Sequence, residues 1–413
     1  MTTYSVKTRC WHQPGELELD FAERWEVCQC RMQGHSASQL SAAQIEDSLA
    51  KPIGTATLSD LAAGKKKVAI IFDDISRPTP IGDLLPPILG ELARAGIPDS
   101  AIRLICALGC HGAHSYQDFA AKLGTAILKR FPVYNHNIYE NCVEVGITSQ
   151  GTVLRVNAEV MSCGLKIGVG SVITHPQTGF GGGGKIILPG VSEISSIEAY
   201  HRLEFQARDA GRGHTIGMAK YADNPLARDF AEAAKLAGLD FKIDCIVNGA
   251  GQVCALFCGD PEKEHRAAVE CAVKHYATEA VPQADIAVVN TYAKENEAMI
   301  GLVIGITLLA QKGGSLVLIM DCPTGQVVHY LLGSFGAVSR GRLFQSIDFD
   351  IPWVKKVIIV CPQFEHATAE WIALPRTTWV HKWEEALAIL QADYPGGARV
   401  ALVPDGTTQY IPA

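Results

Sequence analysis

Positive charge is scarce in this 413-residue chain, because 36 Lys and Arg residues against 43 Asp and Glu residues give a formal net charge of −7. Such a chain has no general positive field for a phosphate backbone or an anionic bilayer, so we expect neither nucleic acid nor a membrane as a partner. Long apolar runs are also missing: the stretch Ile300–Ala310 is too short to span a bilayer and predicts a buried helix. The N-terminal residues show no export or organelle signal, which predicts a cytoplasmic location.

Paired CxxC motifs are absent, although the chain has 13 cysteines. Their number is odd and several lie in apolar runs, as expected for reduced, buried thiols rather than for a disulfide framework. Cys28 with Cys30, and Cys254 with Cys258, could bind a soft metal, but neither pair has the spacing of a structural zinc site. We therefore expect free thiols.

Apolar residues are plentiful, since hydrophobic residues make up 48% of the chain and charged residues 19%. This composition is typical of a globular protein, and the length exceeds the roughly 250–300 residues that one core usually serves. Short β-branched runs alternate with helical stretches, which predicts an α/β fold with mainly parallel sheets. The first part of the chain shows three pairs of a strand and a helix: Val68–Phe72 with Ile81–Ala95, Ile102–Leu108 with Tyr116–Phe131, and Leu165–Ile173 with Ile194–Phe205.

A second α/β series begins after the polar segment Thr278–Asp285, which contains Pro282 and interrupts the periodicity of both neighbours. We predict two α/β domains, residues 1–280 and residues 281–413, with an active-site cleft between them; the last strand or the tail could return to the first domain. The predicted elements of the second series are the strands Ile286–Val289, Leu316–Met320, Val357–Val360 and Val400–Val403 and the helices Ile300–Leu309 and Trp383–Leu390.

Unusually polar residues follow three of the predicted strands. These segments are Asp73–Pro80, Gly109–Gly112 and Thr174–Pro176. Open parallel sheets bind ligands beyond the carboxyl ends of their strands, so one surface is expected to receive all three segments and to carry the chemistry.

The most distinctive segment is Gly179–Lys185, in which glycines let the backbone approach a ligand closely and present its amides to an anion. It superficially fits the pattern GxxxxGK of a nucleotide-binding P-loop. A P-loop, however, needs Ser or Thr after the lysine to bind magnesium, and the chain has Ile186 there. The loop is therefore interpreted as a cradle for another ligand, with a flexible loop that binds nothing as the alternative.

Three histidines accompany this loop. His175 lies ten residues before Lys185, His201 lies sixteen residues after it, and His111 follows an earlier strand. Histidine exchanges protons near neutral pH and binds borderline metals, so the set predicts acid–base chemistry, metal ligation or both.

Arg77 adds a planar guanidinium at a strand end, which suits a carboxylate or a phosphate, and Asp74 or Asp73 could orient it. The alternative is a buried ion pair that closes the turn before two prolines.

Taken together, these motifs resemble the nickel-dependent lactate racemase family in order, spacing and residue type. The resemblance rests on Thr174–Gly190, on His201 downstream, and on Asp74–Pro78 and Gly109–His111 upstream. It implies a nickel ion held by a nickel-pincer nucleotide, pyridinium-3-thioamide-5-thiocarboxylic acid mononucleotide, which is attached to a lysine and completed by a histidine. By position these residues are Lys185 and His201.

The resemblance also implies a reaction. A 2-hydroxy acid gives up a hydride from its α-carbon, and the resulting 2-keto acid receives the hydride back on either face. His111 and His175 match the two positions that exchange the hydroxyl proton, one for each hand of the substrate. The remaining implied roles are cofactor contacts for Gly181, Gly182, Gly183 and Gly184, and substrate contacts for Arg77, Asp74, Tyr292 and Glu295.

Two departures from the family pattern concern the substrate. Gly112 stands where lactate racemases usually have Arg after the histidine, and Tyr292 aligns with the family but is not followed by the expected Gln and Lys. With Glu295 and Glu297 in that region, a larger or hydroxylated 2-hydroxy acid is expected instead of lactate. Cofactor-biosynthesis enzymes are expected partners. Net oxidoreduction or sugar-acid epimerisation, metabolite binding without turnover, and a P-loop nucleotidase remain the alternatives.

Overall fold

The computed structural model describes residues 1–279, 281, 283–309, 313–331, 351–364 and 376–412. The chain forms two compact units. The larger comprises Ala37–Lys274 and Val328–Leu343, and the smaller comprises Met1–Ser36, His275–Val327 and Phe344–Ala413. The sequence predicted one domain over residues 1–280 and another over residues 281–413. In the structure Met1–Ser36 belong to the smaller unit, as does the last strand.

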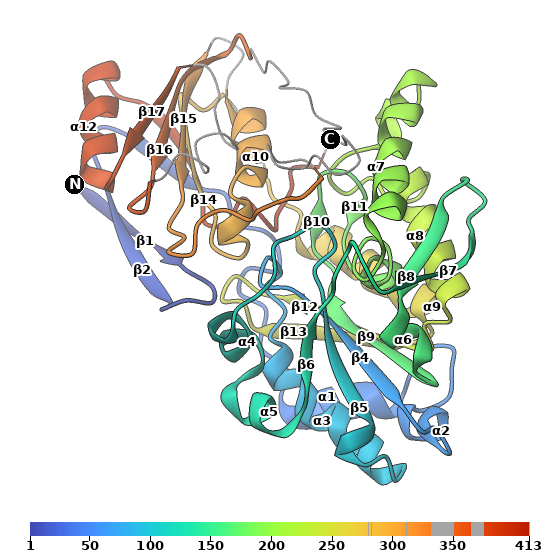
Figure 1. Cartoon of the computed structure of the whole chain (residues 1–413). Helices are drawn as coiled ribbons and strands as arrows, with labels where there is room; N and C mark the ends of the chain where they lie inside the picture. The colour runs from blue at the N-terminus through green and yellow to red at the C-terminus, as the bar shows by residue number, and fades with distance from the viewer. Residues whose placement is uncertain (280, 282, 310–312, 332–350, 365–375, 413) are drawn as a thin grey trace. The chain divides into compact units, whose positions relative to one another are not determined.

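A six-stranded sheet forms the centre of the larger unit (Figure 1). Its order is β13-β12-β9-β4-β5-β6, and every pairing is parallel except that of β13 with β12. The strands are β4 (Val68–Asp73), β5 (Ile102–Ala107), β6 (Val133–Asn135), β9 (Leu165–Ser171), β12 (Phe241–Val247) and β13 (Val253–Gly259). The predicted α/β class with mainly parallel sheets is confirmed.

Both faces of this sheet are buried because successive side chains of a strand point to opposite sides. Ile70 and Phe72 pack into one hydrophobic cluster, while Ala69 and Ile71 pack into another. The first cluster includes residues of α1 (Ala42–Ala50), α2 (Leu58–Ala62), α3 (Ile81–Arg94), α4 (Tyr116–Leu123) and α5 (Thr125–Arg130). The second includes residues of α6 (Ala158–Ser162), α7 (Ile194–Asp209) and α8 (Pro225–Ala237). The unit also contains α9 (Pro261–His275) and the hairpins β7–β8 (Cys142–Ile147, Val153–Asn157) and β10–β11 (Thr174–His175, Gly179–Phe180).

The helix predicted over Tyr116–Phe131 is instead two helices, α4 and α5. Gly124 separates them with φ of 83°, a conformation that favours glycine and ends α4. Ser115 begins α4 with a capping box to Asp118.

The smaller unit is built on a second six-stranded sheet, in which every pairing is parallel. Its order is β17-β16-β15-β14-β18-β3. The strands are β3 (Glu26–Gln29), β14 (Ile286–Asn290), β15 (Gly314–Ile319), β16 (Val354–Val360), β17 (Thr377–Val380) and β18 (Arg399–Val403). Side chains of α10 (Ile300–Leu308) pack on one face of this sheet. Side chains of α12 (Trp383–Asp393) and of the hairpin β1–β2 (Thr2–Thr8, Gly15–Phe21) pack on the other face. Within the described ranges, no helix has the length and hydropathy that a bilayer crossing needs.

Candidate functional site

Three neighbouring strands of the larger unit, β9, β4 and β5, run parallel, so their carboxyl ends share one edge of the sheet. The polar segments predicted from the sequence follow these ends. Asp73 closes β4, Gly109 and His111 follow β5, and His175 follows β9 in the short hairpin β10–β11.

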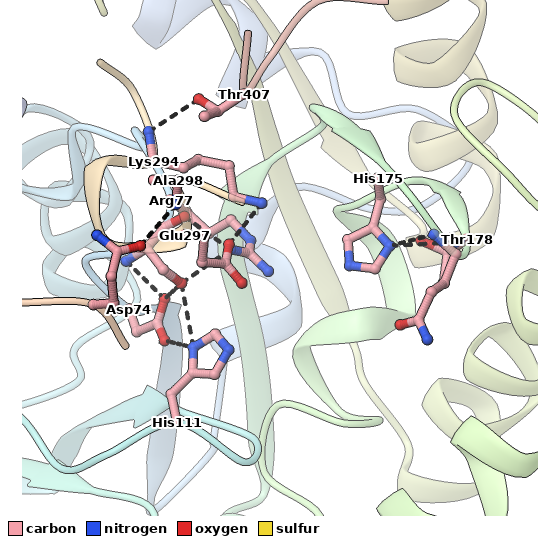
Figure 2. A network of polar contacts seen from close by, with 12 residues as sticks. Asp74, Arg77, His111, His175, Thr178, Lys294, Glu297, Ala298 and Thr407 are labelled. Atoms are coloured by element: carbon pink, nitrogen blue, oxygen red, sulfur yellow. Dashed lines mark hydrogen bonds and ion pairs between the residues drawn. The ribbon is translucent and has the colours of Figure 1, made fainter. Parts of the chain in front are cut away.

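Asp74 and His111 form a short polar contact at this edge. The Asp74 carboxylate accepts a hydrogen bond from His111 Nδ1 at 2.5 Å, and its other oxygen accepts from the Ser76 amide at 3.0 Å (Figure 2). Burial alone would raise the pKa of Asp74, but the imidazole of His111 holds it below its usual range. Because Nδ1 carries the proton in this contact, Nε2 of His111 is the nitrogen with a lone pair.

A buried lysine holds the loop that carries Asp74. The ammonium of Lys122 donates to the carbonyl oxygens of Asp74 and Arg77, both at 2.8 Å, and pairs with Asp73 at 2.9 Å. His114 Nε2 accepts the amide hydrogen of Ile75 at 3.0 Å. These contacts fix the backbone of the Asp74 loop.

Arg77 is half-buried at the same loop. Its Nη1 donates to the carbonyl oxygen of Ser76 at 2.8 Å and to the hydroxyl of Ser76 at 2.9 Å. Its predicted role in binding a carboxylate stays a prediction.

His175 is prepared differently from His111. Its Nδ1 accepts the amide hydrogens of Gln177 and Thr178, both at 3.2 Å (Figure 2). A neutral imidazole with Nδ1 as acceptor carries its proton on Nε2. We therefore assign His111 as an imidazole with a lone pair at Nε2, and His175 as one that presents an Nε2–H.

The glycines before Lys185 are required by the protein around them. A Cβ at Gly182 would lie 2.8 Å from Asp244 Oδ2, one at Gly183 would lie 2.5 Å from the His265 ring, and one at Gly184 would lie 2.3 Å from the Phe230 carbonyl oxygen. Gly182 and Gly183 also have φ of 81° and 52°, which favour glycine. Gly181 differs, since a Cβ there would meet nothing closer than 3.7 Å.

Lys185 lies in a short 3-10 turn, Gly183–Ile186, and is half-buried. His201 lies on α7, is 7% exposed, and donates from Nδ1 to the carbonyl oxygen of Ile197 at 2.8 Å. Burial is the main cause that lowers the pKa of His201 to about 4, and the charges of Lys185 and His111 act in the same direction. His201 is therefore neutral, with its lone pair on Nε2.

This donor set fits the metal centre that the family resemblance implies. A neutral, buried imidazole anchored through Nδ1 is a suitable nickel ligand, and a lysine amine beside it suits a tether. Among the described residues, no group of three or more His, Cys, Asp or Glu could hold a metal ion by itself.

The sequence did not single out His329. The segment Val328–Leu331 pairs with the His111 loop: the Gly112 amide donates to the Val328 carbonyl oxygen at 3.0 Å, and the Tyr330 amide donates to the Cys110 carbonyl oxygen at 2.8 Å. The His329 ring lies 5.5 Å from that of His111 and 6.4 Å from that of His201, between ring centroids. No local motif surrounds His329 in the sequence, so only this long-range pairing reveals it.

The two remaining predicted residues lie in the smaller unit, after β14. Tyr292 is half-buried, and burial raises its pKa above the usual range. Glu295 is 3% exposed, its carboxylate accepts the Cys10 amide hydrogen, and burial raises its pKa to about 7. The nearby Lys294 is fully buried, with its ammonium 2.6 Å from Glu297 (Figure 2). Substrate roles for Tyr292 and Glu295 stay predictions.

His136 and Asn135 contact neighbouring residues of the same unit, and the cysteines form no disulfides. His136 lies buried between Ser192 O, at 2.9 Å, and the side-chain amide of Asn157, at 3.1 Å. Asn135 accepts the His114 amide hydrogen at 3.0 Å. All 13 cysteines are free thiols, as predicted.

These features define an α/β protein whose larger unit gathers a glycine-embedded lysine and several histidines at the edge of a parallel sheet. Residues 13–213 match the lactate racemase N-terminal domain. This match covers just under half of the chain, and the resemblance to the lactate racemase family found in its motifs is confirmed.

Individual relatives agree with this assignment. The lactate racemase of Thermoanaerobacterium thermosaccharolyticum is 29% identical over 288 residues, 68% of this chain and 66% of that protein. The lactate racemase of Lactiplantibacillus plantarum is 29% identical over 246 residues, 59% of this chain and 56% of that protein. The matched regions thus span slightly less than two thirds of the first relative and just over half of the second.

Two solved structures share the fold. The lactate racemase apoprotein from T. thermosaccharolyticum superposes with a TM-score of 0.72 at 24% identity, and covers 99% of this chain and 100% of the other. A protein from Thermotoga maritima superposes with a TM-score of 0.65 at 16% identity, over 91% of this chain and 100% of the other.

Proposed function

We propose that the protein is an isomerase that racemises or epimerises a 2-hydroxy acid with a nickel-pincer nucleotide attached to Lys185. The observation that carries the proposal is the buried imidazole of His201, which is anchored through Nδ1 and lies, like His111, next to the ring of His329 in the unit that also contains Lys185. Sequence similarity to two lactate racemases supports the reaction class.

The bound nucleotide would supply a hydride acceptor that the twenty amino acids lack. The side chains do the rest. Nε2 of His111, oriented by Asp74, takes the hydroxyl proton of the substrate. His175 presents an Nε2–H toward an oxygen, and it must give up its contacts to the Gln177 and Thr178 amides before its ring takes a proton on both nitrogens. The guanidinium of Arg77 offers a bidentate partner for the substrate carboxylate.

We further propose a substrate that is bulkier or more hydroxylated than lactate. The fold does not require glycine at position 112, because an added Cβ would meet only Val328 Cβ, at an ordinary 3.5 Å. The missing side chain therefore leaves room beside His111 where lactate racemases usually have Arg. Sugar acids with a 2-hydroxyl group fit this description and are the second candidate substrate class.

The test is to express the protein together with nickel-pincer nucleotide biosynthesis enzymes and to analyse the Lys185 peptide by mass spectrometry, with nickel measured by elemental analysis. We expect a mass-shifted Lys185 and about one nickel per chain, both lost in K185A and the nickel lost in H201A. An unmodified Lys185 in a host that loads a control lactate racemase would contradict the proposal.

Loaded protein is then screened with single enantiomers of 2-hydroxy acids and sugar acids for loss of optical activity. Substrate deuterated at the α-carbon should keep its deuterium in ordinary water, because internal return of the hydride does not exchange with solvent. Formation of a free keto acid without racemisation would favour the oxidoreductase alternative. Saturable binding without any turnover would favour a metabolite-binding protein.

A further inference from the structure

A buried polar cluster contacts the backbone of the glycine loop. It is formed by Lys242 and Asp244 of β12 and by Glu264 and His265 of α9, whose side chains are all at most 2% exposed. Burying four ionisable groups together is costly unless each has a partner, so their arrangement calls for a function.

Asp244 holds the loop through a backbone amide. Its Oδ2 accepts the amide hydrogen of Gly183 at 2.6 Å, and its Oδ1 pairs with the ammonium of Lys242 at 2.5 Å. Burial alone would raise the pKa of Asp244, but Lys242 keeps it below its usual range, so the carboxylate is charged. A charged acceptor makes a stronger hydrogen bond to an amide than a neutral one does.

His265 holds the loop through a carbonyl oxygen. The Gly181 carbonyl lies 2.9 Å from Nε2, and since a carbonyl only accepts, Nε2 donates. Nδ1 then accepts from the hydroxyl of Tyr221 at 3.1 Å. Burial lowers the pKa of His265, which agrees with this neutral form. The loop backbone is thus held at two residues: His265 donates to the Gly181 carbonyl oxygen, and Asp244 accepts from the Gly183 amide.

Glu264 completes the charge balance. Burial raises its pKa well above the usual range, so it stays a neutral acid. Lys242 and Asp244 then leave no net charge in the cluster.

We infer that Asp244 and His265 are positioning residues that clamp the Gly181–Gly184 backbone and thereby set the place of Lys185 before any cofactor arrives. The loop is a preformed seat, not a flexible segment that closes on its ligand. The consequence for the tether rests on the function proposed above, whereas the clamp itself is a property of the unloaded chain.

Hydrogen–deuterium exchange on unloaded protein tests the clamp, with peptides that cover residues 179–188. Wild-type loop amides should exchange slowly. D244N and H265F should speed their exchange at least about tenfold, because a hydrogen bond to a buried charged or polar group is lost. E264Q, which keeps a neutral group of the same shape, should leave the loop protected. D405N is the matched control, since Asp405 is a buried aspartate of the smaller unit that also accepts hydrogen bonds.

Milder variants keep the test decisive if D244N does not fold. Y221F removes only the hydroxyl that orients His265, and H265Q keeps an N–H that can reach the Gly181 carbonyl. We expect H265Q to restore protection relative to H265F, and Y221F to fall between wild type and H265F. Fast exchange of the loop in wild type, or unchanged exchange in folded H265F and Y221F, would overturn the inference.

Lysine labelling supplies a second readout that altered stability alone would not move. Unloaded wild type and folded variants are treated briefly with acetic anhydride, and acetylation of Lys185 is compared with that of surface lysines by mass spectrometry. Clamp variants should change the ratio for Lys185, and an unchanged ratio would contradict its positioning. If wild-type Lys185 is never modified by the cofactor in a loading host, the proposed function fails, while the exchange and labelling results still decide the clamp.

Discussion

The carboxylate of Asp74 accepts the Nδ1–H of His111 at 2.5 Å, and this contact determines which nitrogen of a neutral His111 keeps its lone pair. Ser76 contacts the same carboxylate through its hydroxyl at 2.5 Å and its amide at 3.0 Å. Substitutions of Asp74 and of Ser76 therefore test separately the acceptor of the His111 proton and the residue that contacts this acceptor.

Replacing Asp74 with Asn should lower the turnover of loaded enzyme by about 10²–10⁴-fold, because His111 would lose the acceptor that fixes its tautomer. The Lys185 adduct and its nickel should remain. S76A is the comparison variant: it removes the contacts of the Ser76 hydroxyl with Asp74, Arg77 and His111 but keeps the contact between Asp74 and His111, so it should have a much smaller effect. Turnover of D74N equal to that of S76A would remove Asp74 from the mechanism.

His175 carries its proton on Nε2, so a variant that keeps a side-chain N–H should be more active than one that does not. In H175Q a side-chain N–H can still donate, so activity should stay within about tenfold of wild type, whereas H175F should lose about 10²-fold or more. Initial rates measured from each enantiomer check this, and both should fall together, because each turnover in either direction uses both histidines. Equal inactivity of H175Q and H175F would show that His175 serves chiefly as a base.

Substitutions at Gly184 and Gly181 distinguish an effect on stability from an effect on cofactor binding. G184A should be destabilised by about 1–3 kcal/mol or more, since its Cβ would lie 2.3 Å from the Phe230 carbonyl oxygen. G181A should unfold at the same urea concentration as wild type, because its nearest neighbour is 3.7 Å away. A lower level of Lys185 adduct in folded G181A would then report a cofactor contact. A strongly destabilised G181A would contradict the described loop geometry.

Stability should depend on pH through His136. Burial lowers the pKa of His136 from 6.5 to about 4, so the unfolded chain binds a proton below pH 6.5 that the folded chain does not take up. The contribution of the neutral His136 to the free energy of unfolding is complete above pH 6.5. It declines as the pH falls toward 4, by an amount on the order of 3 kcal/mol. We would measure the free energy of unfolding in urea for unloaded wild type and H136Q between pH 7 and pH 4.5. It should vary less steeply with pH in the variant, by roughly one proton. An unchanged slope would mean that His136 is not buried and neutral.

The fold class could be predicted because parallel strands buried on both faces read as continuous apolar runs, as in Val68–Asp73. Helix ends were harder, since Gly124 divides α4 from α5 without interrupting the apolar pattern. The histidines next to recognisable glycine and proline motifs were found from the sequence. His329 and Asp244 were not, because His329 meets His111 through a pairing about two hundred residues apart in the chain, and Asp244 lies inside an apolar strand.

The segment Val328–Leu331 belongs to the larger unit although the residue before it, Val327, belongs to the smaller one. A fragment that ended at residue 280 would contain the motifs on which the family resemblance rests. It would lack His329 and the segment that pairs with the backbone of Cys110 and Gly112. It would also carry 36 N-terminal residues without the sheet that β3 joins. We therefore expect that neither half of the chain folds by itself, and that truncation or domain exchange at the apparent linker yields insoluble protein.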